Sequence, residues 1–462
     1  MNEERFKDFN EKRMLIFQEL IKAFWNGDVK DISDLETLAN SIKNTYGFED
    51  KDISFIRNHI RVAMGLDPKG DANFDDELDN LGSKKITHPI VTNIEGACDY
   101  CEEHNDNCVA NCKYEDTIYR RNDGPLIVND KCLSCGYCVS ECDFGAIADK
   151  IEFIPLINLL KNKDTPVYAT IAPAAVGQFG DKVSMGHIRT ALKLLGFKDL
   201  IEVALFADIL TIKEAFEFNK LVKNKEDFFL TSCCCPVWFN MVKKNYPELY
   251  EKMSPSVSPM IASGRILKKL YEDAKVVFIG PCIAKKSEAK EPHLEGAIDY
   301  VLNFKELKEI FEALKIDLDT LEPDDIDHAS LGGRLYARTG GVSFSVKTAV
   351  NRLEPTRVIK LKPRKVHGVK ECKDILNELR DEKDLDANFI EGMGCVGGCV
   401  GGPRTNLDVD TATKRVNDFG EDSFILTPFD NMNILRILEN FNIYNLEGIM
   451  ENEEITKILT RE

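Results

Sequence analysis

The sequence lacks three features that would associate it with a membrane or with nucleic acid. No run of about 18 apolar residues, the length that a membrane-spanning helix needs, occurs in the 462 residues. Acidic residues outnumber basic ones, 78 against 60, and the net charge of −18 argues against anionic membranes or nucleic acid as partners. The stretch MNEERFKDFNEKRMLIF has mixed charge and lacks the apolar core of a secretory signal. We therefore predict a cytoplasmic protein that binds neither membrane nor nucleic acid.

Cysteine, by contrast, is abundant, with 15 residues. Disulfides are rare in the cytosol, so many cysteines in a cytosolic chain indicate metal or redox chemistry. Eight of them lie between positions 98 and 142, and Cys233, Cys234 and Cys235 are consecutive. A disulfide framework would be spread along the chain to close loops, so this clumped distribution predicts metal ligands.

The chain divides into four predicted regions. Residues 1–90 are expected to be a helical N-terminal region, because apolar residues recur three and four apart in RMLIFQELIKAFW and DLETLANSIKNTY. Residues 91–150 hold the first eight cysteines. Residues 151–430 alternate short apolar runs with helical patterns, which predicts an α/β domain with largely parallel strands. Residues 431–462 are expected to form C-terminal helices.

Six apolar runs mark the expected strands of the α/β domain. They are PVYATIAPA, DLIEVAL, DFFLTSC, AKVVFIGPC, AIDYVLNF and ANFIEGMGC. Three of them end directly in cysteine, and in open α/β sheets binding sites form beyond the carboxyl ends of the strands. The basic stretch KLKPRKVHGVK, residues 360–370, is interpreted as a solvated loop in preference to a docking surface for an acidic redox protein.

The first eight cysteines form two similar halves. Cys132, Cys135, Cys138 and Cys142 have the spacing C-x2-C-x2-C-x3-C. Three thiolates on one tight loop can reach three corners of a 4Fe–4S cubane, and the fourth typically serves a second cluster. A zinc site would more naturally use two separated C-x2-C pairs. The other half, with the spacing C-x2-C-x6-C-x3-C, consists of Cys98, Cys101, Cys108 and Cys112.

Together the two halves resemble a bacterial two-cluster ferredoxin domain, which has an α+β fold. The resemblance implies two 4Fe–4S clusters that conduct electrons between a partner and a deeper site. It also implies crossed ligation, with one cluster on Cys98, Cys101, Cys108 and Cys142 and the other on Cys112, Cys132, Cys135 and Cys138. Lys113 and Asp143 stand where such domains usually have a proline after the fourth cysteine.

Three later segments, TSCCCPVW, GPCIAKKSE and EGMGCVGGCVGGP, resemble the signature segments of the catalytic domain of iron-only (FeFe) hydrogenases. TIAPAAVG, ADILTIKEAFEF and RTGGV extend this likeness, which covers roughly residues 91–430 in matching order. The resemblance implies a two-lobed α/β domain that holds an H-cluster, in which a 4Fe–4S cubane is bridged by Cys399 to a two-iron subsite with carbonyl, cyanide and dithiolate ligands. By motif position, the cubane ligands would be Cys235, Cys282, Cys395 and Cys399.

The resemblance also assigns the surroundings of the two-iron subsite. Lys285 would contact the cyanides, and Pro173, Ala174 and Met393 would line the subsite. The alternative for Lys285 is a surface lysine paired with Glu288. Two departures from the usual family pattern, Gly280 before the second-segment Pro–Cys and GGPRT after the last ligand, place the chain on a divergent branch.

A proton relay completes the implied site, in the order Cys234, Glu214, Ser254, Glu217. A thiol with a reference pKa of about 8.5 can donate and accept protons near neutrality. Judged by spacing alone, the two glutamates would be a solvated face of a predicted helix. Cys233, where the family usually has serine, is predicted to be neither a cluster ligand nor the main proton donor.

The function that these resemblances imply is the reversible reaction 2H⁺ + 2e⁻ ⇌ H₂. The expected partners are H₂ and protons, ferredoxin or another redox protein, and the maturation enzymes that supply the two-iron subsite. Two alternatives remain. One is a hydrogen-sensing member of the family with low turnover, although no sensory domain is visible in the sequence. The other is a hydrogenase-like iron–sulfur assembly scaffold. A scaffold needs no proton relay, so Cys234 with Glu214 and Glu217 distinguishes the enzyme from it.

Overall fold

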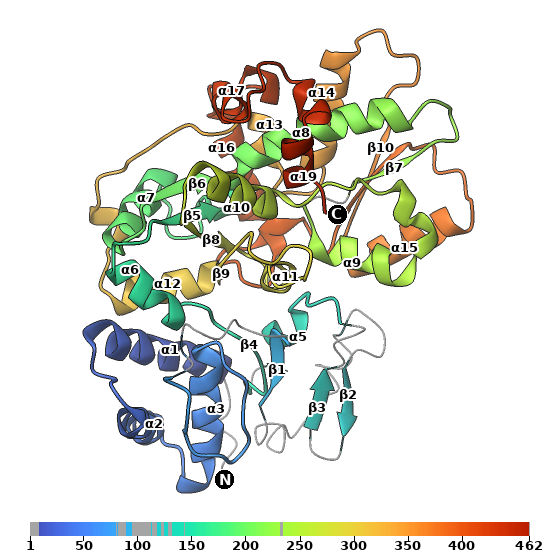
Figure 1. The fold of residues 1–462 in the computed structure, drawn as a ribbon. Coiled ribbons are helices and arrows are strands. Elements are labelled where there is room, and N and C mark those ends of the chain that lie inside the picture. The colour runs from blue at the N-terminus through green and yellow to red at the C-terminus, as the bar shows by residue number, and fades with distance from the viewer. Residues whose placement is uncertain are drawn as a thin grey trace. The chain divides into compact units, whose positions relative to one another are not determined.

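The structure is a computed structural model, shown in Figure 1. It describes residues 9–79, 81, 89–94, 112, 118–121, 124–127, 132–142, 144–231 and 234–461, with the backbone alone at 10–11, 118–121 and 124–127. The sequence-based predictions for Cys98, Cys101, Cys108, Lys113, Asp143 and Cys233 lie outside these residues. The chain forms two compact units, residues 1–163 with 305–317, and residues 164–304 with 318–462. The division into four regions stays a prediction.

The first unit begins with the helices expected for the N-terminal region. They are α1 (Phe9–Asn26), α2 (Ile32–Thr45) and α3 (Ile53–Ala63), and the unit also includes α6 (Ile157–Lys161) and most of α12 (Phe304–Ala313). The Asp31 carboxylate accepts hydrogen bonds from two backbone N–H groups in the first turn of α2 and so caps this helix. The Phe9 ring of α1 packs on Phe55 of α3, with ring centroids 4.7 Å apart. The apolar faces therefore meet, as their spacing predicts.

The described part of the cysteine-rich region contains short elements. They are β1 (Val91–Asn93), β2 (Ile118–Arg121), β3 (Gly124–Ile127), α5 (Tyr137–Ser140) and β4 (Ile147–Asp149). Strand β1 pairs with β4 and β2 with β3, both antiparallel. Two residues of the cysteine loop, Ser134 and Gly136, have positive φ angles of 52° and 81°. These left-handed residues turn the chain tightly between the cysteines.

The second unit is built on two parallel sheets. The first has the order β6-β5-β8-β9 and contains β5 (Val167–Ile171), β6 (Asp199–Glu202), β8 (Lys275–Gly280) and β9 (Tyr300–Asn303). The second has the order β10-β11-β7 and contains β7 (Phe229–Leu230), β10 (Pro363–His367) and β11 (Phe389–Met393). All six predicted strands are present, and the predicted α/β class with parallel sheets is confirmed.

Strand β10 was missed, and the prediction of a solvated loop for residues 360–370 is wrong. Its five residues pair in parallel with β11, from Pro363 opposite Phe389 to His367 opposite Met393. Because β10 is an edge strand, Arg364 and Lys365 are exposed, and charged residues are common on such strands. Their charge hid the strand from a search for apolar runs.

Helices surround the two sheets (Figure 1). They are α7 (Met185–Leu194), α8 (Val203–Leu221), α9 (Pro236–Asn245), α10 (Pro259–Leu270), α11 (Ala284–Glu288), α13 (Leu331–Leu335), α14 (Gly341–Leu353), α15 (Gly368–Arg380), α16 (Val409–Glu421), α17 (Met432–Glu439), α18 (Gly448–Glu451) and α19 (Glu453–Leu459). Helix α8 packs against α10, α13 and α14 and buries 15 of its 19 residues. Its polar side chains must therefore find partners inside the unit.

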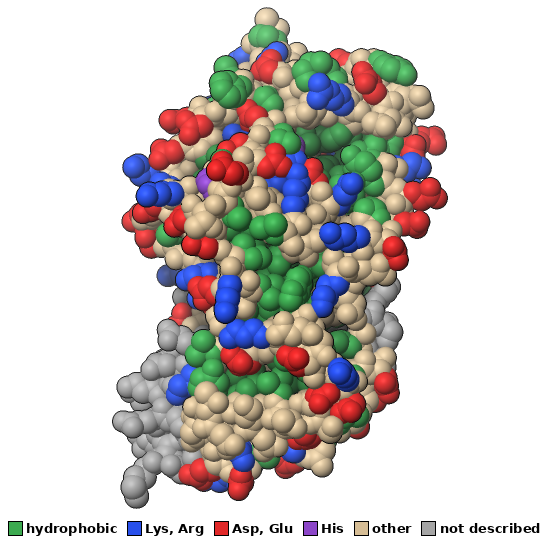
Figure 2. Space-filling view, turned by 90° about the vertical axis from the view of Figure 1, so that its left-hand side faces the viewer, with side chains coloured by type: hydrophobic (Ala, Val, Ile, Leu, Met, Phe, Trp, Pro, Cys, Tyr) green, Lys and Arg blue, Asp and Glu red, His purple; other side chains and the backbone are tan. Residues whose placement is uncertain are grey.

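The face of the molecule in Figure 2 carries charged side chains of both signs around exposed apolar side chains. Within the described residues, no helix combines the length and the apolar character needed to cross a bilayer.

Candidate active site

The first parallel sheet delivers two of the predicted site segments. Strand β5 leads into Pro173 and Ala174, which are buried, and β8 leads through Pro281 into Cys282. The two strands are neighbours, and the backbone N–H of Ala172 donates to the carbonyl oxygen of Ile279 at 2.9 Å. Pro173 and Cys282 therefore follow the carboxyl ends of adjacent strands.

The second sheet delivers the other two segments. Strand β7 leads into Cys234 and Cys235, after which α9 begins at Pro236, and β11 leads through Gly394 into Cys395. The backbone N–H of Gly394 donates to the Cys235 sulfur at 3.2 Å. A Cβ atom at Gly394 would lie 2.6 Å from Val237 of α9, so this close approach requires glycine.

The cysteine thiols of the two sheets lie together. Burial raises the pKa of Cys399 well above its usual value, and the nearby Cys234, Cys235 and Cys282 raise it further. Burial also raises the pKa of Cys235 to about 12, reinforced by Cys234 and opposed by hydrogen bonds from the backbone N–H groups of Gly394 and Trp238. Thiolates are thus disfavoured here until a metal supplies positive charge, and binding metal must release protons.

This donor set fits an iron–sulfur cluster. Cys235 and Cys395 are each 9% exposed, and Cys282 and Cys399 are intermediate. Thiols gathered from three chain segments and largely shielded from solvent are soft ligands of the kind that iron–sulfur clusters use. Cys372, by contrast, is fully buried and donates to the carbonyl oxygen of Met393 at 3.4 Å.

The segment between Cys395 and Cys399 is a glycine turn rather than a helix. Gly397 and Gly398 have φ angles of 80° and 95°, which an α-helix does not allow. A Cβ atom at Gly398 would lie 2.7 Å from the backbone nitrogen of Thr339. The glycines therefore also let the RTGGV segment pack closely against this turn.

Lys285 is buried on α11, so the alternative of a surface lysine is wrong, although the pairing with Glu288 is present. Its Nζ donates to Oε2 of Glu288 at 2.7 Å, and the lysine is 6% exposed. Burial lowers the pKa of Lys285, but the facing Glu288 carboxylate raises it by more, so the pKa lies above its usual value. The side chain is thus a buried ammonium near the Cys282 and Cys399 thiols.

The two glutamates of the predicted relay are buried as well, which contradicts the alternative of a solvated helix face. Glu214 is 0% and Glu217 is 6% exposed on α8. Ser254 is also buried, and its Oγ donates to Oε2 of Glu217 at 2.7 Å. At the inner end, the Sγ of Cys234 lies 3.9 Å from the Sδ of Met393. The structure thus brings together Ser254 with Glu217, and Cys234 with Met393.

Sequence reasoning missed a buried cation beside this relay. Lys213 is 2% exposed, and its Nζ donates to Oε1 of Glu217 and, at 2.8 Å, to Ser256 Oγ. Both carboxylate oxygens of Glu217 thus have donors. The available signal was a lysine within the largely apolar ADILTIKEAFEF, since a charged residue on a helix without a polar face must be paired inside.

The described half of the ferredoxin-like region also gathers its thiols. Burial raises the pKa of Cys138 well above its usual value, and four nearby thiols raise it further. In order of decreasing effect they are Cys135, Cys132, Cys112 and Cys142. The backbone N–H of Ser134 donates to the Cys132 sulfur at 3.3 Å. Cys112, distant in sequence, thus lies close to the C-x2-C-x2-C loop, as does Cys142, and this gathering of thiols is of the kind that a cubane needs; the crossed ligation stays a prediction.

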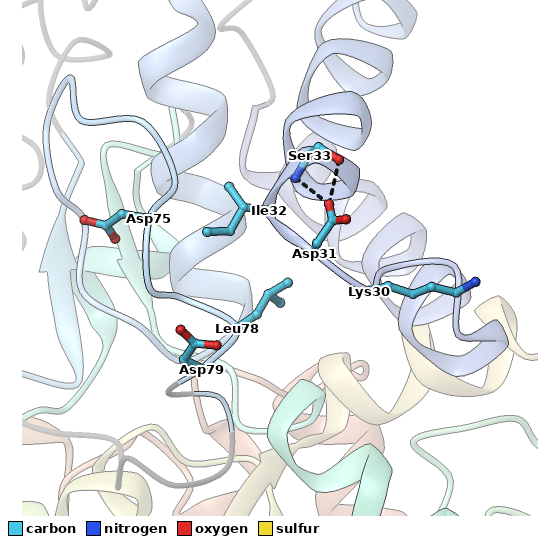
Figure 3. Close-up of a pocket in the computed structure, with 7 residues that line it drawn as sticks. All are labelled: Lys30, Asp31, Ile32, Ser33, Asp75, Leu78 and Asp79. Carbon is cyan, nitrogen blue, oxygen red and sulfur yellow. Dashed lines mark hydrogen bonds between the residues drawn. The ribbon is translucent and has the colours of Figure 1, made fainter.

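An acidic pocket of about 370 Å³ in the first unit contains none of the predicted site residues (Figure 3). It is lined by Lys30, Asp31, Ile32, Ser33, Asp75, Leu78 and Asp79. Two of its carboxylates already have structural partners, because Asp31 caps α2 and Asp75 pairs with Lys69 at 2.6 Å. We assign no ligand to this pocket.

Comparison with known proteins agrees with this geometry. Residues 165–403, more than half of the chain, match the family described as the iron only hydrogenase large subunit, C-terminal domain. The chain belongs to the iron-only hydrogenase family. Residues 125–148 also match a 4Fe–4S binding domain. The predicted family and a ferredoxin-type domain are thereby confirmed.

Curated relatives of this family member are distant. Iron hydrogenase 1 of Clostridium pasteurianum is 28% identical over 304 residues, which cover 56% of this chain and 53% of the relative. An NADP-reducing hydrogenase subunit of Solidesulfovibrio fructosivorans is 27% identical, covering 67% of this chain and 63% of the relative. The chain thus spans between half and two thirds of these two relatives.

Two further likenesses bear on the fold and on the alternatives. A solved FeFe-hydrogenase of Chlamydomonas reinhardtii superposes with a TM-score of 0.52 at 20% identity, covering 65% of this chain and 94% of that structure, which shows a common fold. A probable cytosolic Fe–S cluster assembly factor of Drosophila virilis is 20% identical, covering 62% of this chain and 75% of the relative.

Proposed function

We propose that the chain is a hydrogenase that interconverts two protons and two electrons with H₂. The observation that carries this proposal is one additional thiol, Cys234, beside three of the predicted cubane ligands, Cys235, Cys282 and Cys399. A cubane needs ligands only, whereas catalysis of proton reduction also needs an acid–base group at the reacting centre. Buried glutamates on α8 supply further carboxylates for the same purpose.

The proposed cluster-binding roles follow the motif positions. Cys235, Cys282, Cys395 and Cys399 would hold the cubane, and Cys399 would also hold the two-iron subsite. When bound, the H-cluster supplies the redox chemistry that reduces protons or oxidises H₂. The Lys285 ammonium would donate to the anionic cyanides, while Pro173, Ala174 and Met393 would exclude water from the subsite.

Proton transfer would use the chain's own groups. The Cys234 thiol holds the proton at Sγ, and Glu214, Ser254 and Glu217 pass it onward. The contact of Ser254 with Glu217 at 2.7 Å supports the outer step, because a serine hydroxyl can accept one proton while it donates another. Electrons would enter through the two ferredoxin-type clusters from ferredoxin or another redox protein.

An iron–sulfur assembly scaffold is the second candidate, favoured by the likeness to the cytosolic assembly factor. It would use the same four cubane ligands but no proton chemistry at Cys234. A hydrogen sensor would keep the complete site and differ in turnover alone.

Co-expression with the family's maturation enzymes tests the proposal. We expect carbonyl and cyanide infrared bands together with H₂ evolution from a reduced dye. Cys234→Ala should keep the bands and lose turnover. A wild-type chain with full cubanes and no such bands would favour the scaffold and refute the enzyme. Bands without appreciable turnover would favour the sensor.

A further inference from the structure

The segment that follows α19 reaches the candidate site from a distant part of the sequence. The backbone N–H of Val257 donates to the carbonyl oxygen of Leu459, and that of Arg461 donates to the carbonyl oxygen of Pro255, both at 3.0 Å. Between them, Ser256 and Thr460 form an antiparallel bridge. This short ladder fixes residues 459–461 along the loop that carries the relay serine Ser254.

The ladder places the Arg461 side chain inside the unit. Arg461 is 7% exposed, and its Nη2 donates to Oε1 of Glu288 at 2.7 Å. Its guanidinium carbon lies 3.8 Å from the ring centroid of Phe239, on the helix that begins directly after Cys235. Glu291 lies farther away, 3.6 Å from Nη1. The guanidinium is thus held between an aromatic ring and a carboxylate, an arrangement that arginine favours.

Glu288 connects Arg461 to the site. It is completely buried, and its second oxygen, Oε2, accepts hydrogen bonds from Lys285 at 2.7 Å and from Ser258 Oγ at 2.9 Å. With Oε1 bound to Arg461, the carboxylate cannot rotate without losing an ion pair. The position of the Lys285 ammonium is therefore determined by Arg461, which it does not contact.

The Lys285 ammonium, held in this position, can still donate hydrogen bonds to a bound ligand. An ammonium has three N–H donors, and among the described residues Lys285 uses one, to Glu288. We propose that Arg461 is a positioning residue of the active site: through Glu288 it fixes Lys285 beside Cys282 and Cys399, so that docking of residues 459–461 is required to retain the two-iron subsite. The proposal rests on the proposed function and deepens it.

Infrared bands and iron content test this role. In matured protein, Arg461→Met should keep its cubane iron but lose at least tenfold in carbonyl and cyanide band intensity per chain, as should Lys285→Met. Arg461→Lys, which restores a cation, should recover part of the intensity. The control is Lys269→Met, because Lys269 also holds α19, through an ion pair with Glu454, but both side chains of that pair are about half exposed. Full bands in Arg461→Met would overturn the proposal.

A double-mutant cycle on metal-free protein separates this proposal from the proposed function. Arg461 and Lys285 share Glu288, so the effects of Arg461→Met and Lys285→Met on the unfolding equilibrium constant should differ from additivity by tenfold or more. Additive effects would overturn the positioning role even if the bands are present. Coupled effects in a chain whose wild type shows no bands would refute the hydrogenase function and, with it, any role of Arg461 in retaining the two-iron subsite, while the positioning of Lys285 by Arg461 would stand.

Discussion

The buried Lys213–Glu217 pair allows a quantitative prediction for Lys213→Met. The two side chains are 2% and 7% exposed, and the lysine also donates to Ser256. Removing one partner of a buried ion pair typically costs about 3–5 kcal/mol, because the remaining charge is left without compensation. We expect Lys213→Met to lower the free energy of unfolding of the second unit by this amount. A second change, Glu217→Gln, should restore most of it, since no buried charge then remains.

The two tryptophans provide a probe for this measurement. Trp25 belongs to the first unit, and Trp238, in the second, is 1% exposed. In a Trp25→Phe background, fluorescence during urea unfolding therefore reports on the second unit alone. The matched control is Lys220→Met, on the exposed end of the same helix, which should change stability by less than about 0.5 kcal/mol. A loss below about 1 kcal/mol in Lys213→Met, or a double variant no more stable than the single one, would refute the buried-charge reasoning.

Three further predictions concern the thiol, the metal and a carboxyl group. Cys234→Ala should keep all iron and lose roughly 10²- to 10⁴-fold in hydrogen turnover, and near-normal turnover would exclude it as the proton donor. Matured protein should contain about fourteen irons per chain, against about twelve after reconstitution without maturation enzymes; iron analysis that finds zinc in their place would contradict cluster binding. Burial raises the pKa of Asp208 from 3.8 to about 6, although Ser330 and Asn431 donate hydrogen bonds to it. The folded state then holds a proton that the unfolded state has lost, so stability should fall by about 3 kcal/mol as pH rises through this window and stay level above it. Urea unfolding at pH 4 and pH 7 should show this pH-dependent loss in the wild type and not in Asp208→Asn, and equal pH dependence would contradict the assignment.

Much of the candidate site could be predicted from the sequence, because its ligands follow short, regular patterns. The spacing from Cys132 to Cys142 indicates a cluster loop without any knowledge of the fold. Apolar runs that end in cysteine indicated strand ends, and the structure has strands before Cys282 and Cys395. Local spacing survives folding, so these predictions needed no tertiary information.

Local patterns failed where the environment decides the conformation. The turn between Cys395 and Cys399 depends on positive φ angles at two glycines, which the spacing of the two cysteines does not reveal. Strand β10 has exposed charged residues and is a strand because β11 lies beside it. The relay glutamates have the spacing of a solvated face, yet α8 is covered by other helices.

The sequence by itself indicated the chemistry that we propose for the site: which thiols could hold clusters, which thiol could carry protons, and which family the motifs resemble. Only the tertiary structure decided which charges meet in the interior. Arg461 contacts Glu288 across 173 positions, and Ser254 contacts Glu217 across 37. No sequence period encodes such pairs, because burial forces each buried charge to pair with whatever partner the fold brings within reach.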